Sequence, residues 1–83
     1  MSARPRLTLY GRAGCHLCER MRAALAPLEA ELEFEVHEVD IGGDPALCAR
    51  YGELIPVLAA DGRELCHFVL DAAAVRAQFV QIR

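Results

Sequence analysis

Residues 7–18, LTLYGRAGCHLC, join a strand-like pattern to a pair of cysteines. The alternation of apolar and polar residues ends at Gly11, which predicts a first strand over residues 6–11 and a turn after it. Cys15 and Cys18 follow at the start of a helical pattern, and their spacing places both side chains on one face of that helix. The rest of the fold must therefore be arranged around a strand, a turn and a helix that begins with two cysteines.

Apolar residues continue at helical spacing after the cysteines and predict an amphipathic helix that packs on a sheet. Pro27 lacks a backbone donor, so this helix is expected either to kink near residues 23–27 or to split in two. Residues 33–41 alternate as a second strand, and a helix between two strands makes the strands parallel, with a right-handed crossover. The expected apolar face of the helix comprises Leu17, Met21, Ala24, Leu25, Leu28 and Leu32.

Two further helices are expected in the second half of the chain. Gly42 and Gly43 break the second strand, and Asp44-Pro45 then supply an N-cap and a first-turn proline for a short helix over residues 46–51. Asp71 can cap a last helix. The apolar stripe of that helix is expected to comprise Ala74, Val75, Phe79 and Ile82.

A hairpin is expected between these helices. Two strand-like runs, residues 55–59 and 63–68, flank Asp61-Gly62, and Asp-Gly between such runs is a strong signal for an antiparallel hairpin. The predicted element order is β-α-β-α-β-β-α, which is an α/β fold. No repeat or linker divides the chain, so we expect a single domain over residues 1–83.

Composition and charge narrow the classes of function. The chain has 83 residues and a net charge of −3, and all nine basic residues are arginine. There is no basic stripe, which argues against nucleic acid as a partner. No apolar segment is long enough to cross a bilayer, and the N-terminus lacks the pattern of a signal peptide. We therefore expect a cytoplasmic monomer that binds no membrane.

The four cysteines then need an explanation, because structural disulfides are rare in a reducing cytoplasm. A bond between Cys15 and Cys18 would close a loop of about four residues and stabilise the fold by only roughly 2 kcal/mol. A closed zinc site needs four ligands, and the sequence has no second cysteine or histidine pair at ligand spacing. Redox chemistry is the favoured interpretation, while half of a metal site and plain packing stay open. Cys48 and Cys66 are expected to be small buried residues.

The two cysteines of the pair are not equivalent. If Cys15 is the N-cap of the helix, the backbone N–H groups of Leu17 and Cys18 point back at its sulfur, and the helix dipole adds to their effect. Arg12 and a protonated His16 are nearby cations that also favour a thiolate. Cys18 lies one turn inside the helix. This asymmetry predicts that Cys15 attacks a substrate disulfide and that Cys18 resolves the mixed disulfide.

Three segments carry a resemblance to a known family. They are LTLYGRAGCHLC at residues 7–18, YGELIPVL at residues 51–58 and DGREL at residues 61–65. With the predicted element order, they make the chain similar to the thioredoxin-fold superfamily and, within it, to small glutaredoxin-like proteins, over nearly its whole length. The resemblance implies a four-stranded mixed sheet with helices on both faces and a disulfide oxidoreductase activity.

The resemblance also implies a substrate platform. In the superfamily, the proline that opens the third strand is cis and faces the cysteine pair, and Pro56 matches it. The peptide at Ile55 would then offer backbone hydrogen bonds to an extended substrate. Arg12 and His16, beside the pair, are candidate substrate contacts, although each is also explained as a solvent-exposed residue.

The electron donor and the activity itself stay open. Glutaredoxins carry a Gly-Gly step and an acid after the fourth strand to hold glutathione, whereas residues 66–71 read CHFVLD, with only Asp71 to match the acid. We expect no bound cofactor. Glutathione, a protein thiol and a reductase are all possible donors, and protein or small-molecule disulfides are the expected substrates. The competing hypothesis is a non-catalytic module that delivers a metal or an iron-sulfur cluster, or that binds a protein.

Overall fold

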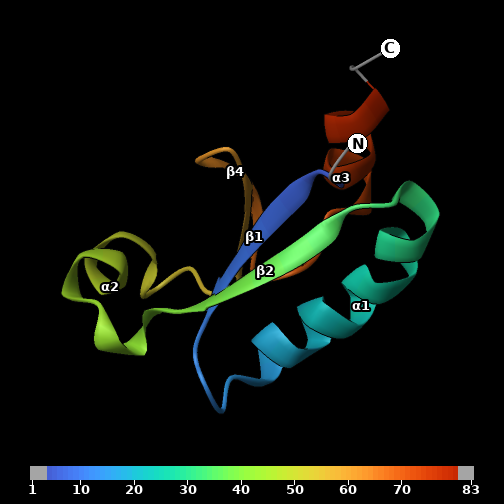
Figure 1. Cartoon of the computed structure of the whole chain (residues 1–83). Helices are drawn as coiled ribbons and strands as arrows, with labels where there is room; N and C mark the ends of the chain where they lie inside the picture. Colours follow the sequence, from blue (N-terminus) through green and yellow to red (C-terminus); the bar gives the residue numbers. More distant parts are fainter. Residues whose placement is uncertain (1–3, 81–83) are drawn as a thin grey trace.

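The computed structural model describes residues 4–80 and contains the predicted order of elements, with one short 3-10 turn added (Figure 1). The elements are β1 (Arg6–Gly11), α1 (His16–Leu32), β2 (Glu35–Asp40), η1 (Ile41–Gly43), α2 (Pro45–Tyr51), β3 (Val57–Ala60), β4 (Arg63–His67) and α3 (Ala72–Val80). No helix within these residues is long and apolar enough to cross a membrane.

The four strands form one mixed sheet in the order β2-β1-β3-β4. β1 and β2 are parallel, as the intervening helix predicts, and β3 is antiparallel to both β1 and β4. In the β3–β4 hairpin, Asp61 and Gly62 both have positive φ, at 52° and 81°. That pair of angles is what a two-residue hairpin turn needs to match the twist of its strands, so the predicted hairpin is confirmed.

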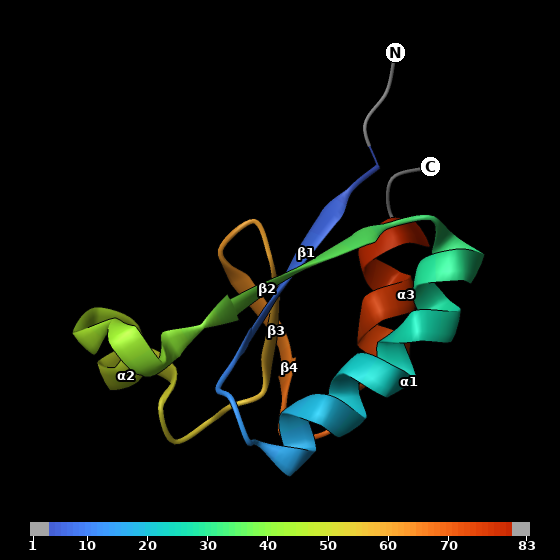
Figure 2. The ribbon, with the colours of Figure 1, turned by 60° about the horizontal axis from the view of Figure 1, so that its bottom comes forward.

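Helices cover both faces of the sheet, as predicted. Leu7 and Leu9 of β1 face the larger core, which α1, α3 and the inward residues of β3 and β4 complete. Tyr10 points to the opposite face, where it stacks on Tyr51 of α2 with 4.4 Å between the ring centroids, beside Val57. Figure 2 shows α1 and α3 together, with α2 on the other side of the strands.

α1 is one unbroken helix, so the prediction of a split at Pro27 is wrong. Pro27 lies on the exposed side of α1, as does Ala23, whose carbonyl loses the donor that a residue other than proline would supply. Water can satisfy a carbonyl on the exposed side, and the helix therefore continues. It ends at Glu33, which has a φ of 59° and donates its N–H to the Glu29 carbonyl.

The buried face of α1 differs from the predicted face at its first turn. Met21, Leu25 and Leu28 are buried as expected, but Leu17 is 41% exposed and Cys18 takes the buried position in its place. Ala24 is exposed as well. The sheet ends beside the first turn of α1, and the helix there packs through Cys18 on the last residue of β1, so Leu17 is left at the surface.

Other predicted boundaries move by one or two residues. β2 is shorter than residues 33–41, because Glu33 caps α1 and Ile41 begins the 3-10 turn. The predicted caps of the two later helices are confirmed: Asp44 accepts from the N–H groups of Ala46 and Leu47, and Asp71 accepts from that of Ala74. Ile82, expected in the apolar stripe of the last helix, lies outside the described residues.

Candidate functional site

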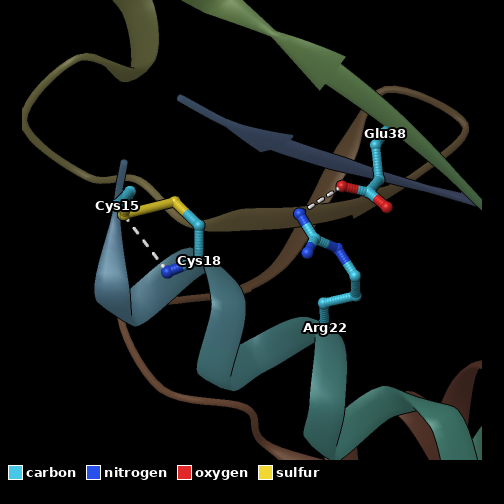
Figure 3. Close-up of polar contacts among 4 residues, drawn as sticks. All are labelled: Cys15, Cys18, Arg22 and Glu38. Carbon is cyan, nitrogen blue, oxygen red and sulfur yellow. Dashed lines mark hydrogen bonds and ion pairs between the residues drawn. A yellow bond between two sulfur atoms is a disulfide. The ribbon is translucent and has the colours of Figure 1, made fainter. Parts of the chain in front are cut away.

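The two cysteines lie at the N-terminus of α1 and form a disulfide, with 5.2 Å between their Cα atoms (Figure 3). Cys15 is the N-cap residue and has an extended backbone conformation. The turn before it is closed by a hydrogen bond from the Cys15 N–H to the Arg12 carbonyl, and Gly14 supplies the positive φ of 78° that this turn requires. The strand, turn and helix of the quoted segment therefore place the pair at one end of the sheet.

The backbone of α1 points at the Cys15 sulfur. The Cys18 N–H donates to the Cys15 sulfur at 3.1 Å, which is one of the two donors predicted from the sequence. The second predicted donor, the Leu17 N–H, makes no such bond among those of the described residues. Access to the two sulfurs also differs, since Cys15 is half-buried whereas Cys18 is only 4% exposed. A bulky reactant can therefore approach Cys15 more readily than Cys18.

Gly11 leaves space for the Cys18 side chain. A Cβ atom at position 11 would lie 3.0 Å from the Cys18 sulfur and 3.3 Å from the Cys18 Cβ. Nine in ten real Cβ contacts are longer than this, so a side chain at position 11 would require Cys18 or the end of β1 to shift by a few tenths of an ångström. The sequence indicated a turn at Gly11, and it gave no signal of this close approach.

A hollow of about 210 Å³, lined by both apolar and charged residues, opens beside Cys18, between α1 and the ends of β1 and β2. Its walls include an ion pair between Arg22 and Glu38, 2.6 Å apart, which Figure 3 shows beside the disulfide. Arg12 and Asp40 also line it. Glu38 is not among the site residues predicted from the sequence. A signal for it exists, because alternation along β2 puts Glu38 on the same side as Val36, which packs against the larger core.

The two candidate substrate contacts next to the pair, Arg12 and His16, differ in the interactions that their side chains make. Arg12 is exposed, lines the hollow and places its Nη2 atom 4.0 Å from the sulfur of Cys48. Cys48 is half-buried in α2 and donates its S–H to the Ile41 carbonyl at 3.0 Å. His16 is the first residue of α1 and is exposed, and it makes no side-chain hydrogen bond or ion pair among those of residues 4–80.

The fourth cysteine takes no part in this region. Cys66 is buried on β4 within the larger core, as predicted, and burial raises the pKa of its thiol. Within the described residues, no group of three or more histidine, cysteine, aspartate or glutamate side chains is placed to hold a metal ion.

The Ile55-Pro56 peptide bond is cis, as the resemblance implies. Tyr10 pairs with Val57 in the sheet, so this bond lies at the same end of the sheet as Gly11 and the cysteine pair. The Ile55 N–H donates to the Tyr51 carbonyl at 3.1 Å, and the Pro56 carbonyl accepts from the Phe68 N–H at 2.9 Å. Two of the backbone groups of the predicted platform are therefore already used within the protein.

Comparison with known proteins supports the architecture. A solution NMR structure of protein Ne2328 from Nitrosomonas europaea superposes with a TM-score of 0.84 at 38% identity, covering 95% of each chain. Thioredoxin 1 from Thermosipho africanus superposes with a TM-score of 0.61 at 13% identity, over 93% of this chain and 96% of that one, and shows the thioredoxin fold.

Sequence comparison points the same way. An uncharacterized protein of Mycobacterium tuberculosis is 36% identical over 84 aligned residues, which cover 95% of this chain and 87% of that protein. Residues 6–79 match the model of a family described as the glutaredoxin-like domain (DUF836). With its thioredoxin fold and its pair of bonded cysteines, which fit a redox role, this chain belongs to the glutaredoxin-like domain family.

Proposed function

We propose that this protein is a cytoplasmic thiol-disulfide oxidoreductase in which Cys15 is the attacking thiol and Cys18 the resolving thiol. The observation that carries the proposal is the asymmetry of the pair. Cys15 is half-buried and receives the Cys18 N–H at 3.1 Å, whereas Cys18 is buried against Gly11. A thiolate forms most readily where backbone donors and a helix N-terminus stabilise it, and it reacts only where a substrate can reach it.

The reaction is a sequence of two exchanges that starts from the dithiol. The Cys15 thiolate attacks one sulfur of a substrate disulfide, and the other substrate sulfur leaves as a thiolate that takes up a proton. Cys18 then loses its proton and attacks the Cys15 sulfur, which breaks the mixed disulfide and releases the second substrate thiol. Two electrons have passed to the substrate, and the protein is left with the disulfide between Cys15 and Cys18.

The end of the sheet supplies a place for the substrate chain. The Ile55 N–H is already bonded to Tyr51, and the Pro56 carbonyl is already bonded to Phe68. The Ile55 carbonyl is therefore the group of this platform that can accept a hydrogen bond from an extended substrate. Arg12 and His16 are exposed near the pair and can contact an anionic group of the substrate. These contacts favour a peptide-like disulfide as substrate.

Trapping the mixed disulfide tests the roles. Reduced protein carrying Cys18→Ser is incubated with a disulfide substrate, and mass spectrometry of proteolytic peptides locates the adduct. We expect a stable adduct on Cys15, and far less adduct on Cys18 in the Cys15→Ser protein. Cys48→Ser serves as the control and should accumulate no adduct beyond the level of the parent. Equal adduct on Cys18 in the converse variant would overturn the assignment.

The electron donor is tested separately. We propose that a thiol, either glutathione or a protein reductase, returns the disulfide to the dithiol. The reduction potential of the pair is measured in glutathione buffers, and turnover is then compared with glutathione and with thioredoxin reductase as donor. Turnover with neither, at potentials that would permit it, would argue for a binding module in place of an enzyme.

A further inference from the structure

An apolar groove lies along the first turns of α1, the helix that begins at the cysteine pair. It has a volume of about 310 Å³ and is lined by Leu17, Met21 and Ala24 of α1 and by Phe68, Val69 and Leu70, which connect β4 to α3. Among the described residues, the large apolar side chains that are exposed are Leu17, Phe68 and Val69, at 41%, 43% and 70%. All three belong to this groove. Exposed apolar residues gathered at one place, in contrast to scattered ones, mark a binding surface.

The wall of the groove is held in place by backbone bonds. Phe68 has a φ of 66°, which is uncommon for an aromatic residue, and its N–H donates to the Pro56 carbonyl. The Val69 N–H donates to the His67 carbonyl at 2.7 Å, and the Phe68 ring packs edge-on against the His67 ring. The segment that carries these apolar side chains is therefore hydrogen-bonded to the proline of the cis peptide bond.

The position of the groove limits what can occupy it. Leu17 stands between the two cysteines in the sequence, so the groove begins within one turn of α1 from Cys15. A residue next to the cysteine of a substrate bonded to Cys15 would lie within reach of it. Arg20 lines the rim, is exposed, and makes no ion pair or side-chain hydrogen bond among those of residues 4–80. Its charge is free to meet an acidic group.

We propose that this groove binds an apolar side chain next to the reacting cysteine of an extended protein substrate that also carries an acidic group for Arg20. This inference rests on the proposed function and names its substrate class. Glutathione offers no apolar side chain, and setting its polar groups against Phe68 and Val69 would remove water from them without replacing the hydrogen bonds.

Activated peptides provide the probes. In reduced Cys18→Ser protein, the Cys15 thiolate attacks the peptide sulfur of a mixed disulfide with thionitrobenzoate, which leaves as a coloured thiolate. One peptide has leucine on both sides of the cysteine and glutamate outside these, a second replaces the leucines by serine, and a third replaces the glutamates by lysine. The mixed disulfide of glutathione with thionitrobenzoate is the fourth probe. We expect the first peptide to react about tenfold faster than the second, which is the lower end of the discrimination that a single methylene group gives in an apolar pocket.

Two adjacent alanines of α1 provide a matched test of the groove. Both are exposed, but Ala24 lines the groove and Ala23 does not. Ala24→Phe should fill the groove and reduce the leucine preference to about twofold or less, whereas Ala23→Phe should preserve it. Val69→Ser should reduce it as well. Arg20→Gln should remove the preference for glutamate over lysine while leaving the leucine preference in place.

The outcomes separate the two proposals. If no probe forms an adduct on Cys15, the proposed function itself fails. If all probes react at equal rates, or if Ala24→Phe keeps the leucine preference, the reaction stands and the groove assignment is overturned. Sedimentation that shows a dimer of the parent, dispersed by Val69→Ser, would also overturn it, because a second copy would then cover the groove.

Discussion

The backbone N–H of Cys18 donates a hydrogen bond to the sulfur of Cys15, at 3.1 Å. The donor belongs to the first turn of α1, where the N–H groups have no partner within the helix. In the dithiol form, the same backbone donor would stabilise negative charge on the Cys15 sulfur. This relationship survives replacement of the Cys18 side chain, because the bond is made by the main chain.

We therefore predict that the reduced Cys15 thiol has a lowered pKa. In Cys18→Ser protein, the rate of alkylation at Cys15 should rise with pH around a midpoint clearly below about 8.5, the value of an unperturbed cysteine. Site-resolved mass spectrometry separates Cys15 from the two remaining cysteines. A midpoint at or above the unperturbed value would mean that the helix terminus does not activate this thiol.

Gly11→Ala should disturb the buried half of the pair. The added Cβ would lie 3.0 Å from the Cys18 sulfur, so Cys18 or the end of β1 must shift. Overpacking of this kind lowers the free energy of unfolding by about 1–3 kcal/mol. We also expect slower closure of the disulfide after Cys15 has reacted, because Cys18 is displaced from its position.

Gly43→Ala is the control for this change, since a Cβ there would meet nothing within 4 Å. Denaturant unfolding gives the stability of both variants, and quenched-flow alkylation gives the rate of disulfide closure. Equal stability and equal closure rates in the two variants would show that β1 accommodates a side chain at position 11.

The fold was largely predictable because its elements are encoded locally. The Asp61-Gly62 turn and the caps Asp44 and Asp71 are each specified by a few adjacent residues, and all three are confirmed. The expected split at Pro27 is wrong because a proline has different consequences on the buried and exposed sides of a helix. Which side is exposed is decided by the packing of the whole domain.

The site was predictable only in part, for a related reason. The spacing of Cys15 and Cys18 and their place before a helix are visible in the sequence, and this arrangement fits a redox role. Helical periodicity, however, does not show where the sheet ends along α1, so Leu17 was expected in the core and lies instead at the surface. The left-handed conformation of Phe68 is likewise imposed by its hydrogen bond to Pro56 and not by its residue type.

The buried thiol of Cys66 should make the free energy of unfolding depend on pH in the alkaline range. Burial raises the pKa of its thiol in the folded protein, while in the unfolded chain it titrates near 8.5. Below that pH both states hold the proton. As the pH rises from there towards the folded pKa, the unfolded state loses its proton first, so the contribution of this thiol to stability is lost.

Denaturant unfolding of the reduced protein, from neutral pH to about pH 10, measures the effect. The free energy of unfolding of the parent should fall more steeply with rising pH than that of Cys66→Ala. The difference between the two free energies of unfolding should therefore narrow. All other ionisable groups are common to the two proteins, so their contributions cancel in the difference. Parallel curves would show that Cys66 ionises equally in the folded and unfolded states.

The ion pair between Glu31 and Arg76 should make the free energy of unfolding depend on pH in the acid range. It joins α1 to α3, with Arg76 Nη2 3.0 Å from Glu31 Oε1 and Nη1 bonded to Oε2. Hydrogen bonding from Arg76 lowers the pKa of Glu31, so the folded state holds its proton less tightly than the unfolded chain does. The stabilisation is therefore complete above the unfolded value of about 4.3 and is lost as the pH falls through the lowered one.

Glu31→Gln should consequently lower the free energy of unfolding at neutral pH, by a small amount because both side chains are half exposed, and this difference should vanish in acid. Glu29→Gln, on the same helix, is the matched control, since Glu29 makes no side-chain ion pair within residues 4–80. Added salt should weaken the effect of Glu31→Gln. If the two variants follow the same pH dependence, the contact between α1 and α3 owes its stability to the apolar core alone, to which α1 contributes Leu25 and Leu28 and α3 contributes Val75.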